Sequence, residues 1–329
     1  MRASLRLPLT ALALLGAVLA SLQVGAHLAP LSQVLDALTG ACTSVDCVVI
    51  SDARLPRTLA GLLAGAALGV AGALMQTLTR NPLADPGILG INAGASFALV
   101  VGMAWLGVNG PDQYVVCAVI GALLANLLVT LSGFTGGGRV SPMRLTLMGV
   151  ALTAVLEGIG SGITLLNPLV FDQIRYWQAG SLDVRNLELI KAAALPIGTG
   201  VLLALGLSRA LDSLGMGLDM AAALGTRVLR TQLLGLLAIT LLSGAATAMV
   251  GPIAFVGLMM PHLARWLAGP EHGRQLPFTL LLTPTVLLLA DTLGRLITAG
   301  ELRVSVMTAF IGAPVLIWLA RRQRLGANG

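Results

Sequence analysis

Long apolar stretches alternate with short polar ones along the whole chain. The apolar stretches recur at about 20 residues, the length that a helix needs to cross roughly 30 Å of hydrocarbon. Within them, polar and apolar residues do not alternate as they would in the strands of a membrane β-barrel. The pattern therefore predicts an all-α polytopic membrane protein. Its ten expected transmembrane helices are 7–28, 57–78, 92–107, 114–133, 143–166, 191–207, 228–248, 253–267, 278–298 and 305–320.

Composition and charge support this interpretation. Hydrophobic residues make up 56% of the chain and charged residues 10%, whereas a soluble domain keeps about 25% charged residues to cover its surface. The formal net charge is +6, but the basic residues stand singly at the ends of apolar stretches. This distribution orients helices in a lipid bilayer, and it argues against a nucleic-acid partner, which would require a basic patch.

An even number of spans places both chain ends on the same side of the membrane. If that side is the cytoplasm, its loops and helix ends carry most of the basic residues, as the positive-inside rule expects. We therefore expect cytoplasmic termini. The first span also has the basic start, apolar middle and small residues of a cleavable signal peptide. Cleavage there is the alternative, and residues 29–55 are exported in either case.

The exported segment contains two cysteines, Cys42 and Cys47. In an oxidising compartment they could form a disulfide that closes a small loop, or they could remain reduced thiols, and their spacing does not decide between the two. His27, His262 and His272 are scattered along the chain, so the sequence offers no cluster of metal ligands.

Glycines recur at helical spacing in two of the expected spans. Gly61, Gly65 and Gly69 share one face of the second span, and Gly158 and Gly162 share one face of the fifth. Such faces let helix backbones approach closely, which is how helices associate where lipid removes the hydrophobic drive. We expect both faces to be packing surfaces.

The second and seventh spans share a short similarity. Arg57-Thr58 precedes the residues GLLA at 61–64, and Arg230-Thr231 precedes GLLA at 235–238. The two spans run in opposite directions in the expected topology. The chain therefore contains either an inverted repeat, which is common in transporters, or a coincidence in a sequence rich in Ala and Leu.

The sequence offers little for an enzyme. The expected spans contain two acidic residues, Glu157 and Asp291. Asp291 lies four residues before Arg295 on one helical face and is expected to pair with it. Glu157 is either a residue of a transport pathway or is satisfied by neighbouring hydroxyl groups. Because Lys191 is the only lysine, no phosphate-binding P-loop is present, and any ATP must bind to a partner subunit.

The longest interior segment on the cytoplasmic side is 208–227. Its apolar and glycine residues predict two short helices joined by a turn, with apolar side chains at the surface. An exposed apolar patch commonly marks a docking site; a helix lying on the bilayer surface is the alternative.

Four stretches resemble the iron-siderophore and cobalamin permease family of ABC importers. They are RLPRTLAGLLAGAALGVAGALMQTLTRNPLADPGILGINAGAS at 54–96, the segment 208–227, GPIAFVGLMMPHLARW at 251–266 and IGAPVLIW at 311–318. The resemblance runs almost from end to end. It implies a single transmembrane permease domain, residues 1–329, with the type II ABC importer fold, in a bacterial inner membrane.

The resemblance also implies a transport subunit rather than an enzyme. Its expected partners are a second homologous permease subunit in a heterodimer, two copies of a cytoplasmic ATPase that binds ATP and Mg, and a periplasmic siderophore-binding protein. The stretches CTSVDCVVISDARLPRTLAG, FDQIRYWQAGSLDVRNL and GELRVSVMTAFIGAPVL are most similar to permeases for ferric enterobactin. Ferric enterobactin or a similar catecholate is therefore the expected substrate. Another ferric siderophore, haem or cobalamin is the alternative within the family, and an ATP-independent secondary transporter is the alternative outside it.

The matching positions imply roles for individual residues. Arginines expected to dock the binding protein are Arg54, Arg57, Arg295 and Arg303. The residues RNPLADPGILG at 80–90 are expected to belong to a gate rather than to a catalytic loop. Expected cytoplasmic gate residues are Asn81, Pro82, Leu83, Val140 and Ser141. Expected contacts with the ATPase are Leu214, Gly217, Leu218, Asp219, Ala222, Leu224 and Gly225.

Residues of the pathway itself are expected from charge. A ferric tricatecholate is strongly anionic, so arginines at the exported mouth would attract it. Arg175 stands beside Tyr176 and Trp177. This group could contact catechol rings while offering a cation, or it could be an aromatic belt at the membrane interface. Glu157, Arg175 and Trp177 are the candidate pathway residues.

Overall fold

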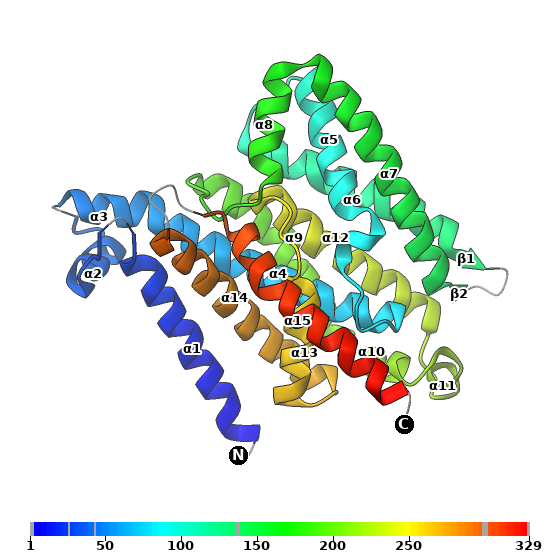
Figure 1. The fold of residues 1–329 in the computed structure, drawn as a ribbon. Coiled ribbons are helices and arrows are strands. Elements are labelled where there is room, and N and C mark those ends of the chain that lie inside the picture. Colours follow the sequence, from blue (N-terminus) through cyan, green and yellow to red (C-terminus); the bar gives the residue numbers. More distant parts are fainter. Residues whose placement is uncertain (1–2, 26, 43, 136–138, 298–301, 328–329) are drawn as a thin grey trace.

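The computed structural model describes residues 3–25, 27–42, 44–135, 139–297 and 302–327. Within them, helices form nearly all of the regular structure (Figure 1). The long helices are α1 (Ala3–Gln23), α4 (Leu55–Thr79), α5 (Ile91–Trp105), α6 (Pro111–Gly133), α7 (Pro142–Leu166), α9 (Leu187–Gly206), α12 (Val228–Val250), α13 (Val256–Ala268), α14 (His272–Ile297) and α15 (Val304–Ala327). The short helices are α2 (Leu31–Thr39), α3 (Val45–Val49), α8 (Pro168–Gln178), α10 (Ser208–Gly215) and α11 (Leu218–Ala223).

Four further elements are small. A π-helical turn, η1 (Ile50–Arg54), leads directly into α4, and a 3-10 turn, η2 (Pro86–Leu89), precedes α5. Strands β1 (Phe134–Thr135) and β2 (Arg139–Val140) pair antiparallel, with Phe134 opposite Val140. The residues 29–55, expected as an exported loop, are therefore largely helical in α2, α3 and η1.

Each expected span overlaps one long helix, although the boundaries differ. The first helix ends at Gln23 rather than at residue 28, and residue 298, expected to end the ninth span, lies outside the described residues. Seven of the described helical segments are long and apolar enough to cross a membrane, whereas α5 and the apolar part of α15, Val304–Ile317, are shorter. The described residues thus form a predominantly helical protein with seven candidate spans.

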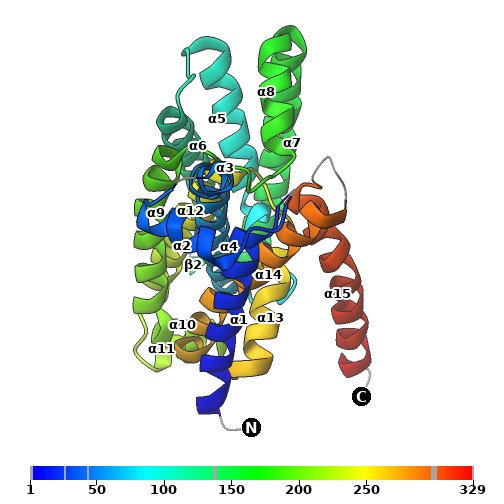
Figure 2. The ribbon, with the colours of Figure 1, turned by 90° about the vertical axis from the view of Figure 1, so that its left-hand side faces the viewer.

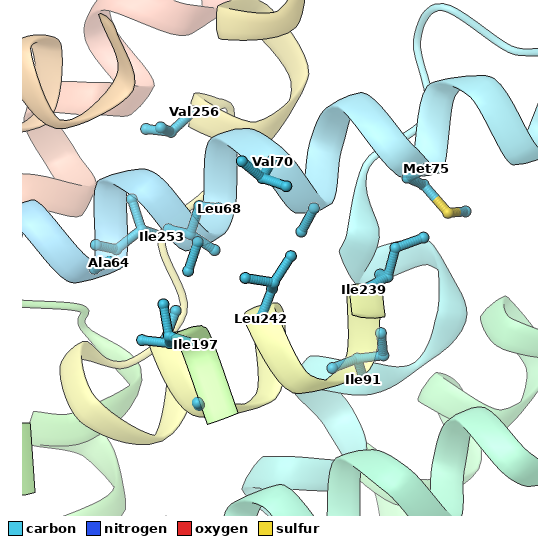
Figure 3. Packing of buried hydrophobic residues seen from close by; sticks show 14 of the residues in the cluster. Ala64, Leu68, Val70, Met75, Ile91, Ile197, Ile239, Leu242, Ile253 and Val256 are labelled. Atoms are coloured by element: carbon cyan, nitrogen blue, oxygen red, sulfur yellow. The ribbon is translucent and has the colours of Figure 1, made fainter. Parts of the chain in front are cut away.

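Helix α4 lies at the centre of the molecule. It contacts α9, α12, α13 and α14. Its buried side chains pack with buried side chains of α5, α9 and α12 (Figure 3). The predicted glycine face of α4 lets neighbouring helices approach it closely. A Cβ added at Gly65 would lie 2.5 Å from the Pro284 Cα of α14, and one at Gly69 would lie 2.8 Å from the Thr283 Cβ of the same helix. The glycine face of α4 is therefore confirmed as a packing surface.

The second predicted glycine face behaves differently. A Cβ added at Gly158 or Gly162 of α7 would meet nothing within 4 Å. The prediction that this face packs closely is wrong within the described part of the chain, because α7 lies at the edge of the bundle, where Val155 and Ile159 are also exposed.

The helix ends divide between two sides of the molecule. The start of α1, the end of α15 and the pair α10–α11 lie at one end, whereas α3 and α8 lie toward the other (Figures 1 and 2). We call the first the α11 end and the second the α8 end. Helix α4 runs toward the α11 end and α12 runs away from it, so these packed helices are antiparallel. An inverted repeat requires this arrangement, and the repeat itself stays a prediction.

Candidate functional site

A cavity of about 680 Å³ opens between α5, α7 and α8. The three candidate pathway residues, Glu157, Arg175 and Trp177, all line it. Helix α8 begins with Pro168 in its first turn, where a proline has no helical hydrogen bond to lose. The structure therefore joins residues that lie on two separate helices into one concave surface.

The cavity combines charge with aromatic rings. The Arg175 guanidinium lies 6.0 Å from the centre of the Phe171 ring and 5.5 Å from that of Tyr176. Its Nη2 lies 3.6 Å from the Asp172 carboxylate in an exposed ion pair, a contact that contributes little energy in water. Trp177 donates its indole N–H to the Ala248 carbonyl (3.3 Å), which holds the ring at the cavity wall. Such a site can hold an anionic ligand with aromatic groups.

Two of the four arginines expected at a docking surface are buried instead. The Arg57 Nε and Nη2 donate to the two Asp291 carboxylate oxygens, each at 2.9 Å. The Arg295 Nε lies 3.3 Å from the same carboxylate, so the expected pair of Asp291 and Arg295 is present. Exposed fractions of the side chains are 8% for Arg57, 1% for Asp291 and 2% for Arg295. We call these three residues the Asp291 cluster, and its contacts within the chain are structural.

The other two arginines are partly exposed. Arg54 donates to the carbonyl oxygens of Leu22 and Gln23 at the end of α1. Arg303 donates to the Tyr176 carbonyl oxygen (2.6 Å), and its guanidinium lies 5.3 Å from the Tyr176 ring centre. Arg303 thus lies beside α8 and the cavity.

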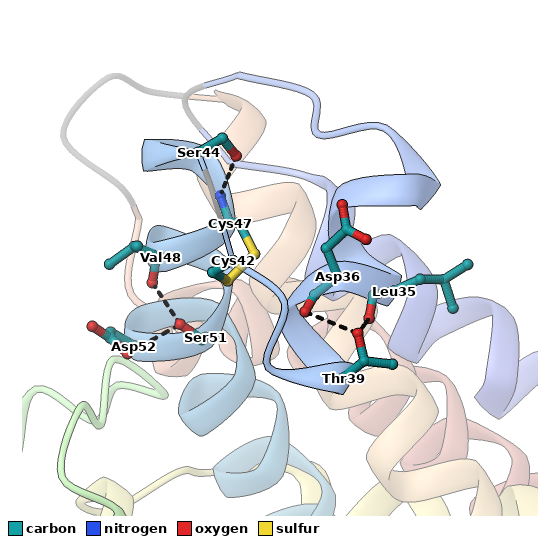
Figure 4. Close-up of a disulfide and its surroundings, with 9 residues drawn as sticks. All are labelled: Leu35, Asp36, Thr39, Cys42, Ser44, Cys47, Val48, Ser51 and Asp52. Carbon is teal, nitrogen blue, oxygen red and sulfur yellow. Dashed lines mark hydrogen bonds between the residues drawn. A yellow bond between two sulfur atoms is a disulfide. The ribbon is translucent and has the colours of Figure 1, made fainter.

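The segment before α4 contains a disulfide. Cys42 and Cys47 are bonded to one another, with their Cα atoms 5.4 Å apart (Figure 4). Ser44 caps α3 by accepting from the Cys47 backbone N–H (3.2 Å). The bond holds the turn between α2 and α3 against η1, which presents Arg54. Among the described residues, no group of three or more His, Cys, Asp or Glu side chains could hold a metal ion.

The expected gate segment at 80–90 folds as two tight turns at the α11 end of α4. Arg80 ends α4 in the left-handed conformation (φ 50°), and the Asn81 side chain accepts from the Leu83 N–H (3.0 Å). Asp85 caps η2 by accepting from the Gly87 N–H (2.8 Å). Burial raises the pKa of the Asp85 carboxyl, and the hydrogen bond from Gly87 opposes that shift.

Helix α13 holds this segment through a hydrogen-bonded network. Since the Pro82 carbonyl can only accept, His262 Nε2 carries the proton that it donates there (2.7 Å). The other ring nitrogen of His262 lies 3.1 Å from Arg265 Nη2, which also donates to the side-chain oxygen of Gln76 in α4. The sequence pattern gave no sign of this network, because its members come from three segments.

The second expected gate loop is partly core. Val140 is 1% exposed, and both its N–H and its carbonyl bind the Gln232 side chain of α12 at 3.3 Å. Ser141 donates its backbone N–H to the Gly133 carbonyl (3.0 Å). The Val140 side chain therefore packs inside the chain instead of facing an opening, since the β1–β2 hairpin folds it against α12.

The segment 208–227 forms the predicted pair of short helices, α10 and α11. They are joined at Gly217, whose φ of +118° favours glycine. Leu214 is 1% exposed and Leu218 is half-buried against the core, so Leu214 offers little surface to a partner, and the expected contacts with the ATPase stay a prediction. The exposed members of the expected set are Asp219, Ala222, Leu224 and Gly225.

Two methionines complete that apolar surface. Met216 is 70% and Met220 54% exposed, and neither is among the expected contacts with the ATPase. Methionine adapts to irregular partner surfaces because its side chain is unbranched and flexible. Helical spacing from Leu224 could have identified Met220, since the two are four residues apart.

Comparisons with known proteins agree with this architecture. Residues 12–322 match the model of the FecCD transport family. The chain is 63% identical over 306 residues to the ferric enterobactin transport system permease protein FepD of Escherichia coli (strain K12), covering 93% of this chain and 92% of that protein. It is 37% identical to the probable siderophore transport system permease protein YfiZ of Bacillus subtilis (strain 168), covering 94% and 93%. It is 38% identical to the vitamin B12 import system permease protein BtuC of Vibrio vulnificus (strain CMCP6), covering 83% of each.

A solved structure has the same fold. The chain superposes with a TM-score of 0.85 on a metal-chelate type ABC transporter in an inward-facing conformation. The two are 27% identical, and the match covers 97% of this chain and 99% of the other.

Proposed function

The chain belongs to the FecCD transport family, and we propose that it is the permease subunit of an ATP-driven importer for a ferric catecholate, ferric enterobactin or a close relative. It is a transport subunit and not an enzyme. The observation that carries the substrate is the 63% identity to a ferric enterobactin permease over 93% of the chain. ATP and Mg²⁺ belong, in this proposal, to a separate ATPase.

The cavity between α5, α7 and α8 supports an anionic, aromatic substrate. Arg175 lies at its wall with Phe171 and Trp177, so a cation and several ring faces are available together. Glu157 lines the same cavity and would repel an anion. We infer that this repulsion limits how tightly the substrate is held, which a transporter needs if the substrate is to leave.

Ten crossings by the long helices form part of the proposal. The start of α1, the end of α15 and α10–α11 share one end of the molecule, which we assign to the cytoplasm of a bacterial inner membrane. The α8 end then faces the periplasm, where a binding protein delivers the substrate and where a disulfide between Cys42 and Cys47 persists.

A second permease subunit would complete the pathway. The open glycine face of α7, at Gly158 and Gly162, is suited to close helix packing but has no neighbour within 4 Å in the described chain. We propose that a homologous subunit packs there in a heterodimer, and that two ATPases contact α10–α11 through Met216, Met220 and Leu224.

The test is uptake of iron-labelled ferric enterobactin by cells that lack only their own copy of this subunit. Ferric hydroxamate and cobalamin serve as parallel substrates. The proposal expects uptake of the catecholate alone, and no uptake when the partner ATPase is inactivated. Uptake of a different substrate would refute the catecholate assignment. Uptake that persists without ATPase activity would refute the ABC mechanism and favour a secondary transporter.

A further inference from the structure

A chain of hydrogen bonds joins α10 to the α11 end of α4. Asp212 of α10 accepts from the backbone N–H and from Nδ1 of His272, both at 2.7 Å. On the other side of the same ring, Nε2 lies 2.6 Å from the Thr77 hydroxyl of α4. His272 is the first residue of α14, so one imidazole bridges three helices.

The protonation of the ring is partly fixed by its partners. A carboxylate accepts but does not donate, so Nδ1 of His272 carries a proton. Nε2 then either accepts from the Thr77 hydroxyl or donates to it, and the link exists in both cases. The bond between His272 and Thr77 is shielded from water, since His272 is 6% and Thr77 8% exposed, whereas the Asp212 side chain is 34% exposed. Shielded hydrogen bonds hold geometry more firmly than exposed ones.

Both ends of this series of hydrogen bonds adjoin segments with proposed roles. Asp212 lies on α10, in the segment assigned to the ATPase. Thr77 lies three residues before Arg80, where the proposed gate segment begins. A Cβ added at Gly217 would lie 3.6 Å from an Arg80 guanidinium nitrogen, so the α10–α11 turn also adjoins the first residue of that segment. Gln76, the residue before Thr77 in α4, accepts a hydrogen bond from Arg265 of α13.

We infer that Asp212, His272 and Thr77 form a positioning link that transmits movement of α10 to the end of α4 and so to the gate segment. The inference rests on the proposed function, because it assumes that the ATPase moves α10. The residues touch neither substrate nor ATP. Their task is to make α10 and α4 move together, so that ATP hydrolysis and gate opening remain coupled.

The test measures substrate transported per ATP hydrolysed, using the complete importer in proteoliposomes with its binding protein. Thr77→Val removes the hydroxyl and keeps the side-chain shape. Thr79→Val is a matched control: Thr79 lies on the same helix, is also 8% exposed, and donates to the Met75 carbonyl of its own helix. The Thr77 hydroxyl oxygen likewise lies 3.0 Å from the Ala73 carbonyl oxygen of the preceding turn, so both variants lose a hydroxyl beside such a carbonyl and only Thr77→Val loses the link.

Thr77→Val is expected to lower the transport-to-ATP ratio at least about fivefold, the lower range of allosteric couplings. Thr79→Val should keep the wild-type ratio, and Thr77→Ser should restore most of it because it keeps the hydroxyl. Asp212→Ala removes the acceptor at the other end of the link and serves if Thr77→Val fails to assemble. The double variant Thr77→Val/Asp212→Ala should be no worse than the stronger single variant, because both substitutions break the same series of hydrogen bonds.

Three results would overturn the link. They are a wild-type ratio for both Thr77→Val and Asp212→Ala, equal losses for Thr77→Val and Thr79→Val, and multiplicative losses in the double variant. A wild-type complex that hydrolyses ATP without moving any catecholate would instead refute the proposed function, and with it the inference. The wild-type assay alone therefore separates the two failures.

Discussion

Replacing Asp291 by alanine should destabilise the protein more than removing either of its arginine partners. The carboxylate binds Arg57 through two 2.9 Å hydrogen bonds and Arg295 at 3.3 Å. Asp291→Ala deprives both guanidinium groups of the carboxylate between them, at a site where it is 1% exposed. Arg57→Met, by contrast, leaves Asp291 paired with Arg295.

The size of the effect follows from desolvation. Removing one partner of a buried ion pair costs about 3–5 kcal/mol, because a charge stays buried without its counter-charge. An unfolding entropy of about 2.1 cal/mol/K per residue over 329 residues converts this loss to a fall in Tm of roughly 4–7 °C. Arg57→Met should lower Tm by less than half of that, and Arg57→Met/Asp291→Leu should recover part of the loss seen in Asp291→Ala.

The assay is thermal unfolding of the detergent-purified protein, followed by intrinsic fluorescence at low and high salt. High salt should change the result little, since the cluster is shielded from water. A Tm for Asp291→Ala within about 1 °C of the wild type would refute the reasoning. So would an unchanged Tm for Arg57→Met together with weaker capture of the periplasmic binding protein, because that result would assign Arg57 to docking.

Three further predictions concern the cavity, the α10–α11 surface and the gate segment. Arg175→Gln should raise the KM for ferric enterobactin uptake several-fold, most strongly at low salt. The control is Arg185→Gln, which changes an exposed arginine that pairs with Asp183 outside the cavity and should leave the KM unchanged. Equal KM values for the two variants would contradict the cavity's role. Met220→Glu should reduce co-purification of the ATPase without lowering membrane insertion, and undiminished co-purification would place the docking surface elsewhere. Asp85→Asn should raise Tm at neutral pH, because burial raises the pKa of the Asp85 carboxyl and makes its ionised form unfavourable in the folded state. The gain in Tm should shrink as pH falls toward about 4, the usual pKa of Asp. A gain in Tm that does not depend on pH would contradict this reasoning.

Much of the fold is predictable from apolar patterning, because lipid demands long apolar helices. Helix α12 begins at Val228, the residue expected, and α7 begins at Pro142, one residue before the expected start. Among the shorter elements, α10 and α11 were predicted, whereas α2, with 9 residues, was not. The capping glycine of α2, Gly40, was the main local sign of its end.

Charged contacts were predictable only within one helix. The Asp291–Arg295 pair follows from a spacing of four residues, whereas Arg57 is 234 residues from Asp291. No local pattern carries that information. The same holds for Asp212 and His272, which are 60 residues apart. The family resemblance supplied roles for positions, but burial of Arg57, Leu214 and Val140 depends on which neighbours the folded chain places around them.

The central position of α4 has a consequence for how the protein is made. The ribosome delivers this helix to the membrane well before α12, α13 and α14, which later enclose it. Until then its glycine face lacks α14, against which it packs in the folded chain, and Arg57 is synthesised 234 residues before its partner Asp291. A nascent chain halted before α14 therefore carries an arginine lacking its carboxylate and a helix face without its partner. These are features by which membrane quality control can recognise an unfinished chain.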